Sequence, residues 1–273
     1  MTARLENPGS YGRIQRDNNM CFQSIVEHRD ATAEQQKINE INTGVFAAPA
    51  RKLKLWVSKL GCENTQGEYY LTDIFAMAVA EGVSVETCQP FDNSEILGIN
   101  DRQDLSFVER IYQKKQAEHH LLAGLTISDP ARFDVRGNLV HGKDCFVDIN
   151  VIFEGNVVLG DRVSIGSNCL IKNMWIGDDA EIRANSILED SSIGELATVG
   201  PYSRVRPESE IAALAHIGNF VEIKKSRVGS GSKVNHLSYI GDSEIGADVN
   251  IGAGVITCNY DGANKYKTII GDK

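Results

Sequence analysis

The 273-residue sequence lacks the features that would place a chain in or across a membrane. No apolar run approaches the roughly 20 residues that a membrane-spanning helix requires. The N-terminus also lacks the short apolar segment of a signal peptide. We therefore expect a cytoplasmic protein without a membrane span.

Excess positive charge and closely paired cysteines are also missing. Lys and Arg together number 28 against 37 Asp and Glu, which gives a net charge of -9 and a pI near 5.2. This balance argues against nucleic acid as a partner, although it leaves room for a local basic cluster that holds a phosphate. The six cysteines have no Cys-x-x-Cys spacing, which favours reduced cytosolic thiols that pack or are incidental: Cys21, Cys62, Cys88, Cys145, Cys169 and Cys258.

A short repeat fills the C-terminal half of the chain. Of its nineteen intervals, fifteen are six residues long and four are five. This period fits neither an α-helix nor an alternating strand, and it is typical of a hexapeptide β-helix. The recurring residues are Val147, Phe153, Leu159, Ile165, Ile171, Ile176, Ile182, Leu188, Ile193, Val199, Val205, Ile211, Ile217, Ile223, Val228, Val234, Ile240, Ile245, Ile251 and Thr257.

The positions of the short intervals indicate a three-sided coil. They begin at Ile171, Leu188, Ile223 and Ile240, and their places in the series leave the same remainder on division by three. All four then lie on one face of a prism, with each recurring residue pointing inward onto its equivalent in the next coil. We expect about six coils, a rod of roughly 30 Å at the spacing of paired strands. Hexapeptide prisms that the array resembles wind left-handed, whereas the period alone does not fix the hand.

The first hundred residues alternate between strand-like and helix-like patterns, which indicates an α/β sheet. No strand, Gly-rich loop and helix unit opens the segment, so a nucleotide-binding domain here would be incomplete. The expected elements are a strand over 21–28, a helix-prone run over 31–40, an extended run over 41–48, helices over 50–61 and 67–82, and a strand over 84–91.

A further helix is expected over 101–122, with an apolar face of Leu105, Val108, Ile111 and Tyr112. Gly124 and the pair Asp129-Pro130 end it.

Several strings carry a resemblance to one family: YGRI, IVEH, EINTG, GEYYLTD and GIN, in that order. They resemble the uridyltransferase half of bacterial bifunctional N-acetylglucosamine-1-phosphate uridyltransferase/glucosamine-1-phosphate acetyltransferases, and the likeness continues through the rest of the chain. It implies a partial, Rossmann-like nucleotidyltransferase domain over 1–100, a linker helix over 101–125 and a left-handed parallel β-helix acetyltransferase domain over 126–273.

The resemblance assigns uridyltransferase roles to four residues. Gly12, Glu27 and Asn42 would contact the N-acetylglucosamine of UDP-N-acetylglucosamine, and Asn100 would contact substrate and ligate Mg²⁺. By pattern alone, Glu27 is equally a solvated charge at a strand end, and Asn42 a turn former.

The sequence departs from the family at both ends. The Gly-rich phosphate loop, the uracil contacts and a further metal-binding Asp would precede Met1 in that family, and further coils would follow Lys273. We therefore expect a fragment that does not bind UTP or transfer a uridylyl group. An unfinished solenoid also exposes strand edges, which predicts poor solubility or association.

The second reaction that the resemblance implies is acetyl transfer from acetyl-CoA to glucosamine 1-phosphate, in a cytosolic pathway to peptidoglycan and lipopolysaccharide precursors. His236 would be the base, without a covalent acetyl-enzyme. Arg206 and Lys224 stand 18 residues apart, one coil, so two stacked cations could embrace the phosphate. Further sugar contacts would be Tyr239 and Asn250, and acetyl-CoA contacts would be Ala253, Asn259 and Tyr260.

The stretch from Cys258 to Thr268 interrupts the repeat before Ile270 resumes it, which predicts a protruding loop that carries Lys265. The resemblance implies that this loop reaches a site shared between prisms of a homotrimer. A zinc site is disfavoured, because His216 and His236 do not repeat on one face. A non-catalytic trimeric scaffold, or a sugar-phosphate-binding remnant, remains the alternative to an enzyme.

Overall fold

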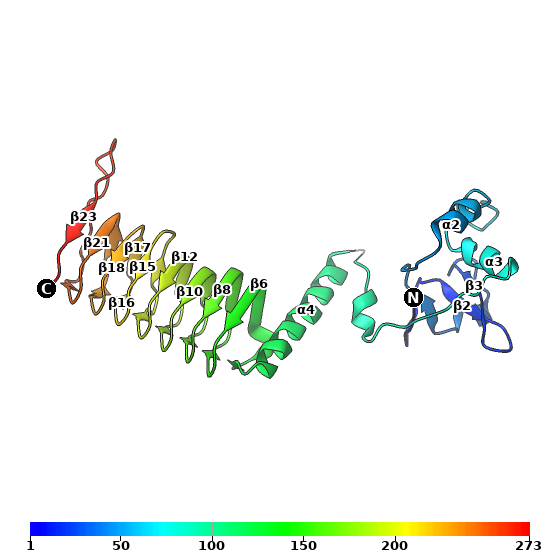
Figure 1. Cartoon of the computed structure of the whole chain (residues 1–273), viewed down its shortest axis with the longest axis horizontal. Coiled ribbons are helices and arrows are strands. Elements are labelled where there is room, and N and C mark those ends of the chain that lie inside the picture. The colour runs from blue at the N-terminus through cyan, green and yellow to red at the C-terminus, as the bar shows by residue number, and fades with distance from the viewer. Residues whose placement is uncertain (100) are drawn as a thin grey trace. The chain divides into compact units, whose positions relative to one another are not determined.

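The computed structural model describes residues 1–99 and 101–273. Its contacts divide into two compact units, Met1–Val108 and Glu109–Lys273. Figure 1 shows the first unit as a small sheet with helices and the second as a stack of coils. No helix among the described residues is long and apolar enough to cross a bilayer.

The first unit contains a four-stranded sheet in the order β1-β4-β2-β3, with every pair antiparallel. Its strands are β1 (Thr2–Arg4), β2 (Arg13–Arg16), β3 (Phe22–Val26) and β4 (Glu40–Asn42). Its helices are α1 (Ala33–Gln36), α2 (Ala50–Val57), α3 (Asp73–Ala80) and the 3₁₀ turn η1 (Asn93–Ile96). A Rossmann-like parallel order is not shown by the described residues of this unit.

The helices of the first unit pack against each other through their apolar side chains. Trp56 of α2 is buried together with Ile74 and Ala78 of α3, and Leu53 and Leu60 pack against this cluster. The expected strand over 84–91 is wrong, because this segment forms no strand. Its backbone is tied to the sheet by one hydrogen bond, from the Thr2 amide to the Cys88 carbonyl at 2.8 Å.

The second unit is a parallel β-solenoid whose strands form two sheets, one of eleven strands and one of eight. The strands are β5 (Thr126–Ile127), β6 (Phe133–His141), β7 (Phe146–Val147), β8 (Val151–Leu159), β9 (Ser164–Ile165), β10 (Leu170–Ile176), β11 (Glu181–Ile182), β12 (Ile187–Ile193), β13 (Thr198–Val199), β14 (Arg204–Val205), β15 (Glu210–Ile211), β16 (His216–Asn219), β17 (Glu222–Lys224), β18 (Arg227–Val228), β19 (Lys233–His236), β20 (Tyr239–Gly241), β21 (Ser243–Ile245), β22 (Asn250–Ile251) and β23 (Thr268–Ile270). The 3₁₀ turn η2 (Pro130–Arg132) precedes β6.

Strand register confirms the three-sided coil. All twenty recurring residues are buried, and they stack in three ladders. Each of the four five-residue steps runs from the second ladder to the third, so all four lie on one side of the prism. The ladders include Ile165–Ile182–Val199–Ile217–Val234–Ile251, then Ile171–Leu188–Val205–Ile223–Ile240, and finally Ile176–Ile193–Ile211–Val228–Ile245–Ile270.

The solenoid begins before the periodic stretch of sequence. Ile127 pairs with Val147, and Val135 pairs with Phe153, so a further coil precedes the first recurring residue. The hexad count misses it because twenty residues separate Ile127 from Val147, instead of the usual seventeen or eighteen. At the other end, Ile270 rejoins the third ladder beside Ile245, as the sequence predicts.

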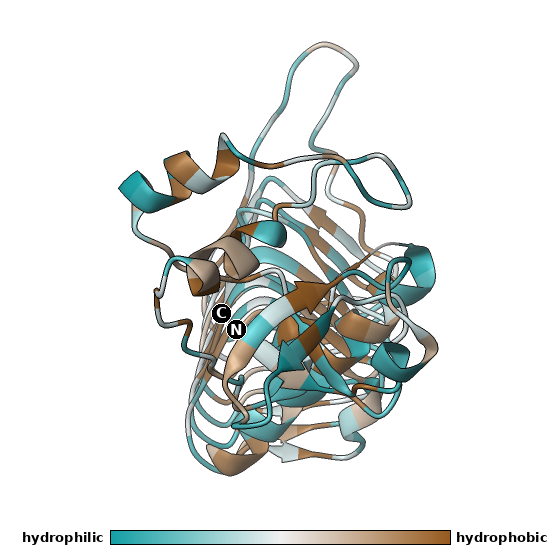
Figure 2. Ribbon diagram, turned by 90° about the vertical axis from the view of Figure 1, so that its right-hand side faces the viewer, coloured by the Kyte–Doolittle hydropathy of each residue, from teal (hydrophilic) through white to brown (hydrophobic). Residues whose placement is uncertain are grey.

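Alternating hydropathy along the coils explains the stacking. In Figure 2, brown hydrophobic positions alternate with teal hydrophilic ones along the solenoid strands. β12 shows the pattern: Leu188 and Ile193 are fully buried, while Ile187 is 38% exposed. Inward residues from successive coils then form continuous apolar ladders, which is the main source of stability in a solenoid.

Helix α4 (Arg102–Leu122) crosses the division between the two units, and its second half closes the first coil. The expected apolar face is only partly right: Val108 and Ile111 are half-buried, whereas Leu105 is 52% exposed and Tyr112 is 49% exposed. The buried residues of α4 are Gln113, Ala117 and His120. A helix that caps the solenoid needs polar partners for the open strand edge of the first coil as well as apolar contacts, and Gln113 supplies the polar partners.

Candidate functional site

The predicted base His236 lies at one edge of the prism. It ends β19, and its register partner on the preceding coil is Asn219 at the end of β16. The imidazole Nδ1 is 3.2 Å from Asn219 Oδ1. The side chain of His236 is exposed. Nδ1 of the ring therefore has a hydrogen-bond partner, and the rest of the exposed ring can be reached from solvent.

The coil that follows His236 has a small residue, Ala253, at the corresponding position. Ala253 follows Ile251 by two residues, as His236 follows Val234, and Val234 pairs with Ile251. An added Cβ at Gly252 or Gly254 would meet no atom within 4 Å. This predicted acetyl-CoA position thus lies directly beside the predicted base, in open space.

The predicted phosphate ligands lie on the adjoining face. Val205 pairs with Ile223, so the residues that follow them, Arg206 and Lys224, are stacked one coil apart as predicted. Arg206 Nη1 lies 2.9 Å from Glu222 Oε1, and both side chains are about one-third exposed. An incoming phosphate therefore has to compete with Glu222 for the guanidinium. Among the described residues, Lys224 has no ion-pair partner.

Tyr239 belongs to the same face. It opens β20 and pairs with Glu222, and its phenol lies over Gly241, where an added Cβ would be 2.5 Å from the hydroxyl oxygen. Gly241 pairs with Lys224. A larger residue at position 241 would displace the Tyr239 ring. Gly241 therefore leaves the space that lets the phenol lie beside Lys224.

A column of exposed apolar side chains runs along the edge between these two faces. Tyr202, Phe220 and Leu237 are 54%, 55% and 64% exposed and all have left-handed φ values, 57°, 58° and 48°. The rings of Tyr202 and Phe220 stack with centroids 5.4 Å apart. Other turns of the solenoid have the same left-handed φ, among them Leu196 and Leu214, so this backbone conformation belongs to the fold. What distinguishes this edge is that three successive coils expose an apolar or aromatic side chain there.

The protruding loop is present as the sequence predicts. Residues 258–268 leave the coil after Thr257, and they are largely exposed except for Asn259. The loop stands clear of the coils in Figures 1 and 2 and is mainly hydrophilic in colour. A single antiparallel bridge joins Tyr260 to Lys265. Nothing else in the described chain packs over its tip.

Two predicted acetyl-CoA contacts in this loop, Asn259 and Tyr260, differ in their exposure to solvent. Asn259 is only 9% exposed, and its amide donates to the Asp242 carboxylate, which fixes the base of the loop. Tyr260 is 60% exposed, and its hydroxyl donates to the Gly262 carbonyl. Asn250, the remaining predicted sugar contact, lies exposed on the face of β22 beside Lys233. It does not share the face that carries Arg206 and Lys224.

His216 lies on the same sheet as His236. Burial lowers its pKa, and the charges of Arg183 and Lys233 lower it further. His216 therefore stays neutral at neutral pH. Within residues 1–99 and 101–273, no group of three or more His, Cys, Asp or Glu side chains is placed to hold a metal ion.

In the first unit, three predicted residues come together. The backbone N–H of Asn42 donates to the backbone carbonyl of Gly12 at 2.9 Å. An added Cβ at Gly12 would lie 3.4 Å from both carboxylate oxygens of Glu27. Glu27 also accepts a hydrogen bond from the Thr72 hydroxyl at 2.8 Å. The fourth predicted residue, Asn100, lies outside the described residues.

Two adjoining pockets open beside Glu27, whereas Gly12 and Asn42 line neither of them. One has a volume of 370 Å³ and the other 420 Å³, and both are lined by Glu27 and Tyr70. Thr72 lines the second. Polar walls of this kind suit the hydroxyls of a sugar better than an apolar ligand.

Sequence reasoning missed three side chains that touch the predicted ones. Asn219 contacts His236, Glu222 contacts Arg206, and Thr72 contacts Glu27. The first two were within reach of the hexad count, because each lies 16 or 17 residues from its partner, close to one coil. Thr72 is 45 residues from Glu27, and no period connects them.

The comparisons with known proteins place a family signature in the solenoid. Residues 138–173 match the family model "Bacterial transferase hexapeptide (six repeats)". Solved structures that are similar include the acetyltransferase domain of PglB from Neisseria gonorrhoeae, with 13% identity over 54% of this chain and 62% of that one, and a TM-score of 0.33.

Two further structures show the same level of similarity. A mutant perosamine N-acetyltransferase from Caulobacter crescentus, in complex with CoA and GDP-perosamine, is 18% identical over 66% of this chain and 70% of that one, with a TM-score of 0.35. UDP-N-acetylglucosamine acyltransferase from Francisella novicida is 16% identical over 45% and 63%, with a TM-score of 0.30. The chain spans 62% of the length of the PglB domain. These scores are too low to assign a function, and the family model covers residues 138–173 alone.

Proposed function

We propose that the solenoid transfers an acetyl group from acetyl-CoA to the amine of glucosamine 1-phosphate. The observation that carries the proposal is the gathering of His236, Tyr239, Arg206 and Lys224 around one edge of the prism, on neighbouring coils. A base, a hydroxyl and two cations are the groups that an amino-sugar phosphate requires. The resemblance of the sequence to the bifunctional family supports the same assignment.

The chemistry needs no covalent intermediate. The amine nitrogen attacks the thioester carbonyl, the carbon–sulfur bond breaks, and CoA leaves as the thiol after protonation. His236 accepts the proton that the amine loses, while Arg206 and Lys224 hold the phosphate. Ala253 leaves room beside the imidazole for the thioester. Tyr260 and the exposed part of the loop would contact acetyl-CoA; Asn259 would do so only through its backbone, because its amide is engaged with Asp242.

The apolar column Tyr202, Phe220 and Leu237 supports a homotrimer. Exposed apolar side chains of this size are more stable when another surface covers them. Their position directly beside His236 suits a site completed by a neighbouring prism. The same column also favours the second candidate, a trimeric scaffold without catalysis, and activity distinguishes the two.

In the first unit, the cluster of Gly12, Glu27 and Asn42 supports binding of the N-acetylglucosamine part of UDP-N-acetylglucosamine. Uridylyl transfer from UTP is what the resemblance implies for the whole bifunctional protein, which serves peptidoglycan and lipopolysaccharide precursors; for these residues we propose sugar-nucleotide binding alone. Mg²⁺ would serve that reaction, with Asn100 as its implied ligand. The described residues form no metal cluster, so no step is derived through the ion.

Release of CoA thiol from acetyl-CoA tests the first activity. The wild-type protein should release thiol only when glucosamine 1-phosphate is present. His236→Ala should lower the rate by about 10² or more. His119→Ala is the matched control, since His119 is an exposed imidazole on α4. Equal rates for wild type and His236→Ala would remove His236 from the base role, and no activity in folded wild type would favour the scaffold.

Phosphate recognition is tested by comparing substrates. Lys224→Ala should raise KM for glucosamine 1-phosphate and leave the rate with free glucosamine unchanged, because only the phosphorylated sugar uses the cation. A parallel loss with both substrates would place Lys224 in the fold instead.

Sugar-nucleotide binding to the first unit is tested with Gly12→Ala, whose Cβ would lie 3.0 Å from Ile25 and 3.4 Å from the Glu27 carboxylate. Gly271→Ala, in the second unit, is the control, since its Cβ would meet no atom within 4 Å. Calorimetry with UDP-N-acetylglucosamine should show weaker binding for Gly12→Ala alone. Equal affinities for both variants and wild type would remove the cluster from the site.

A further inference from the structure

The pairing of His236 with Asn219 has a geometry that decides which imidazole nitrogen carries a proton. The two residues are register partners at the ends of β19 and β16, and the Nδ1···Oδ1 distance is 3.2 Å. An amide oxygen only accepts hydrogen bonds, so Nδ1 must be the donor. In the neutral ring, Nε2 is then unprotonated and has a free lone pair.

The free nitrogen is also the accessible one. Asn219 lies on the coil before His236, and Ala253 lies at the corresponding position on the coil after it. Gly252 and Gly254 flank Ala253 with open space around their Cα atoms. Asn219 on the preceding coil orients the ring by its hydrogen bond, and the small residues on the following coil leave the ring uncovered.

No charged group near His236 replaces Asn219 as the hydrogen-bond partner of its ring among the described residues. On its own sheet the nearest titratable neighbours are His216 of β16 and Lys233 of β19, while β22 contributes the neutral Asn250. Across the edge, the Glu222 carboxylate is engaged with Arg206. Among the described residues no carboxylate forms an ion pair with His236. Asn219 is therefore the side chain that fixes the ring.

We propose that Asn219 is the positioning residue of the acetyl-transfer site: it holds His236 in the Nδ1–H form so that Nε2 faces the amine of the bound sugar phosphate. This inference rests on the proposed acetyl transfer. Asn219 acts through His236 and takes no proton itself. Without it, both tautomers and several ring orientations are available, and only a fraction of the protein has its base in the reactive state.

The tautomer is measured without any activity. Long-range ¹H–¹⁵N spectra of the ¹⁵N-histidine-labelled protein above pH 7.5 separate protonated from unprotonated ring nitrogens. His236, identified by its loss in His236→Ala, should show a protonated Nδ1 and an unprotonated Nε2. Asn219→Ala should shift this population toward the Nε2–H form, which predominates in free imidazole side chains. A wild-type His236 with protonated Nε2 would overturn the proposal, whether or not the protein transfers acetyl groups.

Kinetics then distinguish positioning from a structural role. Asn219→Ala should lower kcat at least about tenfold, with KM for both substrates within about twofold. Asn219→Asp should recover most of kcat, because a carboxylate also accepts from Nδ1–H. It should also move the acidic limb of the pH–rate profile to higher pH, since a negative charge stabilises the imidazolium.

The matched control is Asn138→Ala, an exposed asparagine on β6 with no side-chain hydrogen bond to the described residues. It should leave rate, pH profile and melting temperature unchanged. Thermal unfolding of Asn219→Ala should also match wild type. If Asn219→Ala melts normally and keeps its kcat, Asn219 has no positioning role. If Asn219→Asp fails to recover activity while the tautomer is correct, the hydrogen bond is not what catalysis uses.

Discussion

The side-chain amide of Gln113 pairs with the backbone of Val135 as a neighbouring strand would. Gln113 Oε1 accepts from the Val135 amide at 2.8 Å, and its Nε2 donates to the Val135 carbonyl at 3.1 Å. Val135 lies in β6, the outermost strand of its sheet, whose other edge pairs with β8. The helix therefore supplies polar partners to the strand edge that has no preceding coil to bond with.

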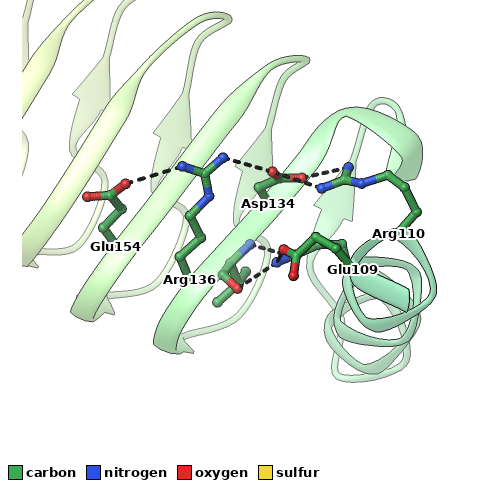
Figure 3. A network of polar contacts seen from close by, with 7 residues as sticks. Glu109, Arg110, Asp134, Arg136 and Glu154 are labelled. Carbon is green, nitrogen blue, oxygen red and sulfur yellow. Dashed lines mark hydrogen bonds and ion pairs between the residues drawn. The ribbon is translucent and has the colours of Figure 1, made fainter. Parts of the chain in front are cut away.

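Ion pairs extend the same contact outward, as Figure 3 shows. Arg110 binds Asp134 with both guanidinium NH groups, at 3.0 and 3.1 Å, and Arg136 bridges Asp134 and Glu154. Burial alone would raise the pKa of Asp134, but Arg110 and Arg136 outweigh it and hold that pKa below its usual range. These surface pairs orient the helix end and contribute little energy individually.

Replacing Gln113 tests the end-cap. Gln113→Ala should lower the free energy of unfolding by about 1–3 kcal/mol, because it leaves a buried N–H and C=O of Val135 without partners. Gln103→Ala, an exposed glutamine of the same helix, should change it by less than about 0.5 kcal/mol. Urea titration of both variants measures the difference. Equal stabilities would show that Gln113 does not stabilise the edge.

Adjacent residues of β12 test the inward ladder. Leu188 is fully buried and Ile187 is 38% exposed, so one alanine substitution opens a cavity in the core and the other trims the surface. Leu188→Ala should cost about 2–5 kcal/mol, whereas Ile187→Ala should cost less than about 1 kcal/mol. Chemical unfolding followed by circular dichroism gives both values. Similar costs at the two positions would contradict the register.

Acid should weaken the junction of α4 and the first coil through His120. Burial lowers the pKa of His120 to about 4, helped by the neighbouring His141 and His119, while the unfolded-state value is 6.5. The unfolded chain thus binds more protons between these values, so stability is lost as pH falls from 6.5 toward 4, by up to about 3 kcal/mol.

The measurement is the free energy of unfolding at pH 7 and pH 4.5. His120→Phe should remove most of this pH dependence, and His119→Phe should reduce it only slightly, because His119 is exposed and contributes to the His120 shift after burial and His141. If wild type and His120→Phe lose the same free energy on acidification, another group is responsible.

The six cysteines should separate into two classes on alkylation. Burial raises the pKa of Cys169 to about 11 and also raises the pKa of Cys145, so both remain thiols at pH 8. Iodoacetamide should label Cys21, Cys62, Cys88 and Cys258, which are exposed, and spare the other two until denaturant is added. Mass spectrometry counts the adducts. Rapid labelling of Cys169 in the native protein would mean that its coil opens.

The sequence by itself determined the solenoid, because in such a fold the residue count along the chain is also the spacing across it. A buried residue every five or six positions places each coil on the last, so Ile165, Ile182 and Val199 had to meet. The same count stacked Arg206 and Lys224. The helices over 50–57 and 73–80 lie within the ranges expected from local patterns, because helix hydrogen bonds join residues that are close in sequence.

The tertiary structure decided what local patterns do not encode. Gln113 and His120 are buried in place of Leu105 and Tyr112 because the end of the solenoid, and not the hydrophobicity of the helix, selects the face that packs. The segment over 84–91 forms no strand because a strand needs an edge to pair with, and it makes one backbone bond only. The one-coil spacing places Asn219 beside His236, but only the folded backbone brings Asn219 Oδ1 within 3.2 Å of His236 Nδ1.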